Sequence, residues 1–383
     1  MNILFVHPNL CKRAYNQICA ICKYTPHTPY LLYGEPDVSA MNLADNVKRF
    51  CASYKKVFRF RKIPYIYKFF RRVIRRYCKE WDIDLIHAFN MPDDVAVAAI
   101  ETKTVPVIFD VRDMVTSFSK KLLAKRVLPD KFLKVHPIYK LTSDSVSLYV
   151  SNMEKKAIEE STARVFSTEC MLEYSRDRYN IDDNNIVFYN YALDDESPGK
   201  KEKKYSSYDG EIHTGFTGNI SIHDEYRNFL PLFKKLANKK IHVHMHVVTK
   251  DKASLLACKK VAEDNRYLHF YPPMPVTKIL RELSKCDFGL LPFSTKVEKK
   301  YFDLILPNKL FDYLSAGLPV ASTDIQCVKR FLEINEVGFI YENEEDLVAK
   351  LLENMGKFTV KPEKFLIGSN IKKLTKLYEN IAG

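Results

Sequence analysis

The stretch LPNKLFDYLSAGLPV, residues 306–320, joins a loop, a helical pattern, a glycine stop and a buried apolar run. It predicts a helix over 309–316 that Gly317 ends, followed by a short strand. The first N–H groups of a helix have no partner within it, and Lys309 stands beside them, so this helix start suits a diphosphate. Asp312 follows one turn later and could accept hydrogen bonds from sugar or ribose hydroxyls. An ordinary helix with a solvated lysine and aspartate explains the same residues equally well.

The alternation of short apolar runs and helical patterns recurs along the whole chain of 383 residues. It predicts an α/β fold with two Rossmann-like, doubly wound domains, because apolar strands separated by helices form parallel sheets covered on both faces. The expected domains are residues 1–195 and 212–358. A charged, serine-containing linker is expected over 196–211, and a terminal helical segment over 359–383 is expected to pack back toward the first domain.

The individual elements follow from the same patterns. In the first domain we expect strands at 3–7, 28–34, 84–88, 105–111, 146–151 and 186–189, and helices at 15–24, 63–81, 93–102 and 153–161. In the second domain we expect strands at 212–215, 241–248, 268–271, 288–291, 320–322 and 339–341. The expected helices there are 225–238, 253–264, 276–285, 309–316 and 345–355, with a last helix at 371–381.

The formal charge of +13, from 60 Lys and Arg against 47 Asp and Glu, is concentrated in residues 48–79. That segment contains thirteen basic residues and no acidic one, so the other 351 residues are neutral in sum. This distribution argues against nucleic acid as a partner and favours one local docking surface. The helix expected within the segment has an apolar stripe, and its opposite side is cationic. Docking on an anionic membrane is expected for Lys68, Arg71, Arg72, Arg75 and Arg76.

A solvated helix back is the alternative explanation of those charges, and RNA binding is a weaker one. No export signal or membrane-spanning helix is expected, and nine scattered cysteines fit reduced thiols, so we expect a cytoplasmic protein peripheral to the inner face of the membrane.

His242, His244 and His246 lie on one face of a predicted strand, where they could form a metal ladder. We nevertheless expect no metal and no cofactor.

Residues 307–320 resemble the nucleotide-sugar segment of GT-B glycosyltransferases, especially the retaining, family 4-like members of glycosyl transferases group 1. Their pattern Pro-x-Lys-x-x-Glu-Tyr-x-x-x-Gly-x-Pro-Val matches at the same spacing, with Asp312 where glutamate is usual. Four further segments are similar to motifs of that family: GFTGN at 215–219, CDFGLLPF at 286–293, DIDLIHA at 82–88 and FDVRD at 109–113. The resemblance implies two Rossmann-like domains facing a central cleft.

The resemblance also implies an activity and a set of residues. The activity is transfer of a sugar, with retention and without an essential metal, from a nucleotide-diphosphate donor to a lipid-linked glycan or polysaccharide of the capsule, O-antigen or exopolysaccharide type. The implied catalytic residues are Asp113, Lys309 and Asp312. The implied donor site comprises Gly218, Asn219, Arg227, Tyr271, Pro273, Pro307, Asn308, Lys309 and Asp312. The implied acceptor side comprises Asn9, His87, Arg112 and Asp113.

The resemblance is incomplete at one acidic position of the donor site. Leu304 stands eight residues before Asp312, where a second glutamate is usual, and Asp303 is adjacent. A catalytically silent GT-B scaffold in a membrane-associated glycan-synthesis complex is therefore the alternative function. A sugar-nucleotide epimerase of the same shape is a weaker one. At Arg227 an ordinary surface role is as good an explanation as donor binding, and at His87, Arg112 and Asp113 loop capping is the competing one.

Overall fold

The computed structural model describes residues 1–7, 10–34, 43–52, 64–90, 93–127, 136–199, 202–224, 226–249, 251–293 and 298–382. The chain divides into two compact units. The first unit is Met1–Tyr189 together with Asn370–Gly383, and the second is Asn190–Ser369. Both are α/β units with parallel sheets, so the predicted fold class is confirmed.

The first unit contains a seven-stranded sheet in the order β3-β2-β1-β4-β5-β6-β7. All of its strand pairs are parallel. The chain therefore leaves β1 in one direction as far as β3 and then returns to the other side of β1 with β4, as in doubly wound folds. The strands are β1 (Asn2–His7), β2 (Thr28–Tyr33), β3 (Lys48–Cys51), β4 (Leu85–Phe89), β5 (Val107–Val111), β6 (Ala163–Phe166) and β7 (Asn185–Val187).

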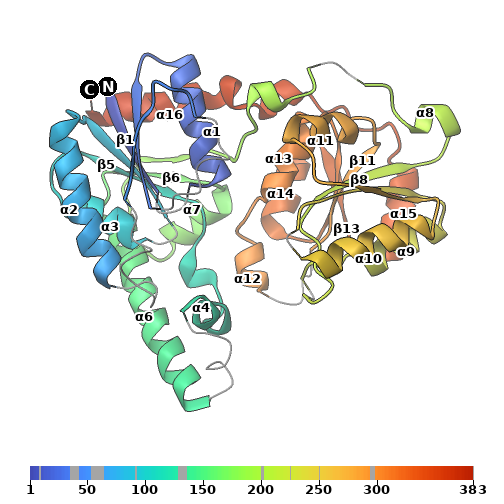
Figure 1. Cartoon of the computed structure of the whole chain (residues 1–383), viewed down its shortest axis with the longest axis horizontal. Helices are drawn as coiled ribbons and strands as arrows, with labels where there is room; N and C mark the ends of the chain where they lie inside the picture. The colour runs from blue at the N-terminus through green and yellow to red at the C-terminus, as the bar shows by residue number, and fades with distance from the viewer. Residues whose placement is uncertain are drawn as a thin grey trace. The chain divides into compact units, whose positions relative to one another are not determined.

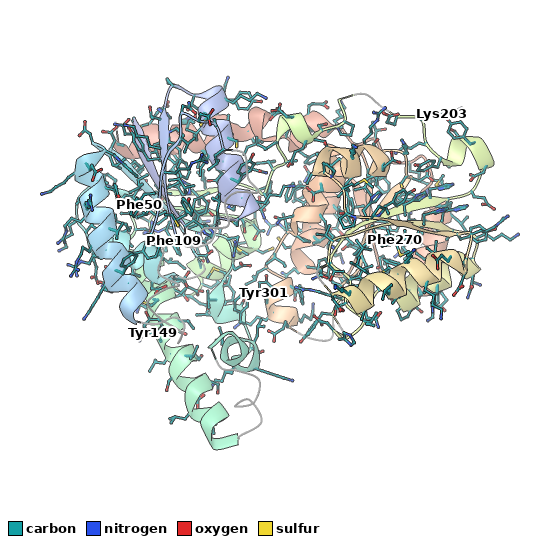
Figure 2. All side chains as sticks on the ribbon, in the orientation of Figure 1. Phe50, Phe109, Tyr149, Lys203, Phe270 and Tyr301 are labelled. Carbon is teal, nitrogen blue, oxygen red and sulfur yellow. The ribbon has the colours of Figure 1, made fainter. Side chains whose placement is uncertain are left out.

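Helices cover this sheet, and α2 and α3 lie side by side along one flank (Figure 1). Phe109 on β5 is fully enclosed in the interior of the unit (Figure 2). The helices are α1 (Lys12–Tyr24), α2 (Pro64–Glu80), α3 (Asp94–Ile100), α4 (Lys120–Val127), α6 (His136–Glu160) and α7 (Glu169–Arg176), with a short 3-10 turn at Val115–Ser117. The last helix, α16 (Ile367–Ala382), contributes its residues from Asn370 onward to this unit.

The strand expected over 146–151 is wrong, because these residues lie inside α6. A short apolar run is compatible with a buried strand and with part of a helix. Here the helical pattern continues on both sides of the run. The strand that fills this place in the sheet is β6, whose apolar pattern is interrupted by Arg164. Its guanidinium is buried because Nε donates to the Ile158 carbonyl at 2.5 Å and Nη1 pairs with Asp182 at 2.6 Å.

The second unit contains a six-stranded parallel sheet in the order β10-β9-β8-β11-β12-β13. Its strands are β8 (His213–Gly218), β9 (His242–Val247), β10 (Leu268–Tyr271), β11 (Phe288–Leu291), β12 (Val320–Thr323) and β13 (Gly338–Tyr341). Its helices are α8 (Ser206–Asp209), α9 (Leu230–Asn238), α10 (Lys252–Glu263), α11 (Val276–Leu283), α12 (Lys299–Phe302), α13 (Asn308–Ser315), α14 (Gln326–Asn335) and α15 (Glu344–Glu353), with short 3-10 turns at Asp194–Glu196 and Pro362–Phe365.

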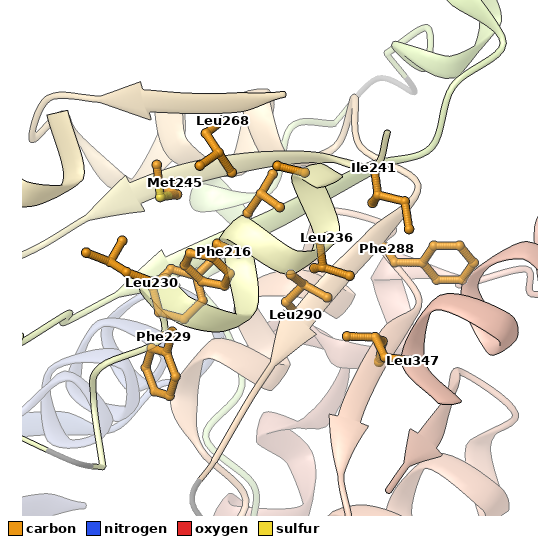
Figure 3. Packing of buried hydrophobic residues seen from close by; sticks show 14 of the residues in the cluster. Phe216, Phe229, Leu230, Leu236, Ile241, Met245, Leu268, Phe288, Leu290 and Leu347 are labelled. Atoms are coloured by element: carbon orange, nitrogen blue, oxygen red, sulfur yellow. The ribbon is translucent and has the colours of Figure 1, made fainter. Parts of the chain in front are cut away.

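The two faces of the second sheet are covered differently. One face carries large apolar side chains, among them Phe216, Met245 and Leu290, which pack under α9, α10 and α15 (Figure 3). The opposite face carries glycines where helices approach closely: a Cβ on Gly289 would lie 2.5 Å from the Tyr313 ring of α13. Phe270, on the first of these faces, belongs to strand β10 (Figure 2). The absence of a side chain at Gly289 therefore lets α13 pack close against this face of the sheet.

Within the described ranges, no helix combines the length and the apolarity that crossing a bilayer requires.

Candidate active site

The carboxyl end of β8 lies at the point where the strand order of the second sheet reverses, between β8 and β11. Ligands of doubly wound sheets bind beyond the strand ends at this point. Gly218 ends β8 with φ of 135°, a conformation that side-chain-bearing residues rarely adopt. A Cβ here would lie 3.4 Å from Nζ of Lys309, so the glycine leaves room beside the ammonium. Asn219 follows and is exposed.

The ammonium of Lys309 lies among three phenyl rings. Its Nζ is 4.4 Å from the ring centre of Phe216, 5.6 Å from that of Phe229 and 5.5 Å from that of Phe293. The negative faces of such rings attract a cation without neutralising it. Among the described residues, Lys309 forms no hydrogen bond or ion pair to a carboxylate. The rings therefore hold the ammonium in place, and its positive charge is not neutralised by a described carboxylate.

The pKa of Lys309 is lowered to about 8, first by burial and then by the nearby cation of Arg227, while Asp312 raises it. The lysine still carries its proton at neutral pH. Arg227 is exposed and lies in the loop before α9, which begins five residues later than predicted, at Leu230 rather than at 225. The loop thus brings a second cation close enough to lower the pKa of Lys309.

The start of α13 presents backbone N–H groups at the same place. Pro307 occupies the cap position in an extended conformation and provides no side-chain cap. The Asn308 side chain accepts a hydrogen bond from Asn190 at 2.9 Å. The Tyr313 hydroxyl accepts from the Thr217 amide at 3.1 Å and donates to the Leu290 carbonyl at 2.9 Å, which fixes α13 to β8 and β11. Sequence reasoning missed Tyr313, although its motif contains a tyrosine at this position.

Two predicted donor residues lie at the carboxyl end of a more distant strand. Tyr271 ends β10, and its ring stacks on His246 with 4.4 Å between ring centres. Its hydroxyl lies 2.9 Å from Nδ1 of His244. Pro273 follows in an exposed loop. Because β9 separates β10 from β8, the structure does not bring these two residues into contact with Lys309.

In the first unit, Arg112 and Asp113 follow the carboxyl end of β5 and pair with each other at 3.1 Å. Burial lowers the pKa of Arg112, but Asp113 and Cys11 outweigh it and the pKa is raised. Asn90 holds this turn: its side chain accepts from the Arg112 amide at 3.0 Å and donates to the Asp113 carbonyl. Asn90 is the first residue after β4. A polar residue at such a strand end is a sequence signal for a site, and we missed it.

His87 does not line an acceptor site, which corrects the prediction. It lies in the middle of β4 with no exposed surface. Its Nδ1 is 2.7 Å from the Tyr378 hydroxyl of α16, and its Nε2 is 3.2 Å from Asp110. Asp110 is in turn paired with Arg13 at 2.7 Å. His87 therefore helps to anchor the last helix on the first sheet. Asn9 lies outside the described residues.

The predicted apolar stripe of α2 is confirmed at Phe70, Ile74 and Tyr77, which are buried. Phe69 is 38% exposed and lies next to the cationic side. On that side Arg71 pairs with Glu101 at 3.2 Å, and Arg76 with Glu80 at 3.2 Å. Three further cations are exposed and form no ion pair with a described residue: Lys68, Arg72 and Arg75.

Comparison with known proteins gives a family and a fold. Residues 211–356 match the family model of glycosyl transferases group 1. This match lies within the second unit, and residues 211–356 are here called the group 1 domain. No curated protein sequence matches the chain.

Solved structures with a similar fold extend the comparison to the whole chain. A glycosyltransferase from Rickettsia africae ESF-5 is 14% identical, with a TM-score of 0.66 over 99% of this chain and 98% of that one. WaaG, a glycosyltransferase involved in lipopolysaccharide biosynthesis, is 14% identical, with a TM-score of 0.56 over 99% and 93%. Anabaena HepE in complex with UDP is 11% identical, with a TM-score of 0.59 over 100% and 98%. The chain thus has the fold of these GT-B glycosyltransferase structures over its whole length.

The group 1 domain departs from the pattern of that family at position 304, eight residues before Asp312. Leu304 is buried and holds no charge toward a donor sugar. Asp303 is engaged elsewhere: it pairs with Lys299 at 2.8 Å and accepts from the Gln326 amide, the first of α14, at 3.2 Å. The carboxylate next to the missing glutamate therefore stabilises the junction of α12 and α14.

Proposed function

We propose that this chain transfers a sugar, with retention, from a nucleoside diphosphate sugar to a lipid-linked glycan or polysaccharide at an anionic membrane surface. The donor would bind at the end of β8 in the group 1 domain. The observation that carries this proposal is the Lys309 ammonium, which is caged by three rings beside Gly218 and has no carboxylate partner among the described residues.

The chemistry of donor cleavage requires what these residues provide. When the bond between the anomeric carbon and the diphosphate oxygen breaks, the electron pair stays on the diphosphate, whose negative charge increases. Lys309, Arg227 and the N–H groups at the start of α13 would stabilise that charge in place. Asp312, one turn along α13, would accept hydrogen bonds from hydroxyls of the donor. Among structures with this fold, HepE holds UDP.

An acceptor at the membrane is supported by the cationic side of α2. Lys68, Arg72 and Arg75 are exposed and unpaired among the described residues, and the half-exposed ring of Phe69 lies beside them. Each basic residue near an anionic membrane contributes about 1 kcal/mol. A membrane surface is where a lipid-linked acceptor would be met. WaaG, with the same fold, is involved in lipopolysaccharide biosynthesis.

The test is a screen of nucleoside diphosphate sugars for release of the nucleotide, with and without lipid-linked glycan acceptors. The wild-type chain should turn over at least one donor, and Lys309→Met should lower kcat by about 100- to 1,000-fold. Lys234→Met, which changes an exposed lysine of α9, is the matched control and should keep full activity. Nucleotide binding without any turnover would instead favour the silent scaffold, and full activity of Lys309→Met would refute the donor site.

A further inference from the structure

Five histidines gather on the glycine-bearing face of the second sheet, away from the donor end of β8. His213 and His242 open β8 and β9 and are direct register partners. Their rings stack with centres 4.2 Å apart and planes within 2°. Because both are the first residues of their strands, they lie at the amino edge of the sheet, whereas Gly218 ends β8 at the carboxyl edge. The proposed sugar transfer does not use them.

Two carboxylates meet the outward nitrogens of these two rings. Nε2 of His213 lies 3.0 Å from Oδ2 of Asp209, which is the last residue of α8. Nε2 of His242 lies 2.7 Å from Oε2 of Glu211 and 3.9 Å from the same Asp209 oxygen. The ligand atoms of Asp209, His213 and His242 all lie within 4.8 Å of one another. Ligand atoms around a tetrahedral Zn²⁺ are separated by roughly 3.4 Å, since the bonds are about 2.1 Å long.

The inward nitrogens are held by a second row of rings. Nδ1 of His213 lies 2.8 Å from Nε2 of His244, and Nδ1 of His242 lies 2.9 Å from Nε2 of His269. His244 continues to the Tyr271 hydroxyl at 2.9 Å. In metal sites a ligating histidine donates its other N–H to a carboxylate, a carbonyl or water, which fixes the ring and its tautomer. Here a second imidazole nitrogen takes the place of that acceptor. His213 and His242 therefore each have a hydrogen bond at Nδ1 that leaves Nε2 for a metal ion.

We propose that Asp209, Glu211, His213 and His242 bind one Zn²⁺ ion with two nitrogen and two oxygen ligands. The two rings must tilt toward each other on binding, because the lone pairs of parallel rings do not converge on one point. The ion replaces the protons that the two Nε2 atoms share with the carboxylates. The site joins the end of α8 to the first residues of β8 and β9, so its role is to fix α8 in place.

The surroundings support a structural role of this kind. Tyr205, just before α8, stacks on His244 with ring planes within 2° and donates its hydroxyl to Glu282 of α11 at 2.7 Å. Lys204 donates to the carbonyls of Ser284 and Cys286. This segment is thus already bonded to α11 and the turn that follows it, and a metal ion at Asp209 would add a link at the end of α8. Of the expected ladder of His242, His244 and His246, only His242 would be a ligand.

The test uses the full chain, stripped with a chelator and then titrated with Zn²⁺ in competition with a chromophoric chelator. We expect one tight site per chain and a higher melting temperature in Zn²⁺. Asp209→Asn and Glu211→Gln should each weaken binding at least tenfold and, combined, abolish the thermal shift. Both variants should fold, since Asp209 is 41% exposed and Glu211 is partly exposed. The control His223→Gln, an exposed histidine of the same unit, should bind like the wild type.

Co²⁺ substitution identifies the ligands, which matters because the chain has nine free cysteines. We expect the visible absorption of four-coordinate Co²⁺ without a thiolate charge-transfer band. Three results would overturn the proposal: no saturable Zn²⁺ binding, unchanged binding by the Asp209→Asn/Glu211→Gln double variant, or a thiolate band. The first two would mean that the histidines form only a hydrogen-bonded network.

Discussion

Lys309 illustrates how a single residue combines a charge with a hydrophobic setting. Three rings surround its ammonium, and burial lowers its pKa to about 8. A lysine in water has a pKa near 10.4, so this one loses its proton within the range in which enzymes are assayed. The motif predicts Lys309 as a phosphate ligand. It does not predict the cage, because Phe216, Phe229 and Phe293 come from three separate segments of the sequence.

The first prediction is a pH dependence of nucleotide binding. The charged lysine exists below its pKa, so affinity for the nucleotide that binds should be highest below about pH 8 and fall by up to about tenfold per pH unit above it. Calorimetric titration across this range measures the effect. Lys309→Met should bind weakly and without this dependence. If the wild type and the variant weaken in parallel as pH rises, Lys309 is not the responsible group.

The second prediction concerns Asp110, whose importance the sequence did not reveal. Burial raises the pKa of this carboxyl, but Arg13 and His87 outweigh it and the pKa lies at about 2. Because the pKa of the folded state lies below the ordinary value, the carboxylate stabilises the fold above about pH 4, and this contribution is lost as pH falls toward 2. Asp110→Asn leaves Arg13 buried without its partner and should lower the free energy of unfolding by about 3–5 kcal/mol.

Urea unfolding at neutral pH measures that change, and Asp45→Asn, an exposed position in the same unit, is the control. The variant should also lack the loss of stability between about pH 4 and pH 2. Equal stability of Asp110→Asn and the wild type would show that the pair with Arg13 is dispensable.

At the scale of elements, α13 is positioned by one tyrosine. The Tyr313 hydroxyl bonds to β8 and β11, and its ring rests on Gly289. Tyr313→Phe keeps the ring but leaves the buried Thr217 amide without its acceptor, so the free energy of unfolding should fall by about 1–3 kcal/mol. Chemical denaturation measures this, with the exposed Tyr208→Phe as the control. A change no larger than that of the control would contradict the assigned role.

Elements with a regular apolar pattern are predictable from the sequence, whereas a charge inside a short apolar run can hide a strand. The strands at β1, β10 and β11 and the helix α13 lie where apolar runs and Gly317 place them. The strand β6 escapes prediction because Arg164 interrupts its apolar pattern, and the Ile158 carbonyl together with Asp182 explains how the charge is buried. Likewise, the side chain of His87 turns inward to Tyr378, almost three hundred positions away in the chain.

For the whole molecule, the uneven charge is the feature on which the proposed membrane docking rests. Replacing Lys68, Arg72 and Arg75 by Gln should reduce sedimentation with anionic liposomes at least tenfold, since the three charges contribute about 3 kcal/mol together. The matched control replaces three exposed lysines of α16 by Gln: Lys372, Lys373 and Lys376. Both triple variants lose the same charge, so an equal loss in both, or equal binding to neutral vesicles, would refute docking through α2.

The donor site in the group 1 domain is the central claim, and nucleotide binding tests it most directly. Calorimetric titration of the full chain with UDP, GDP and CMP should show saturable binding of at least one nucleotide. Lys309→Met should weaken that binding by at least tenfold, and Lys234→Met should leave it unchanged. No binding of any nucleotide by the wild type, or equal binding by Lys309→Met, would contradict the account.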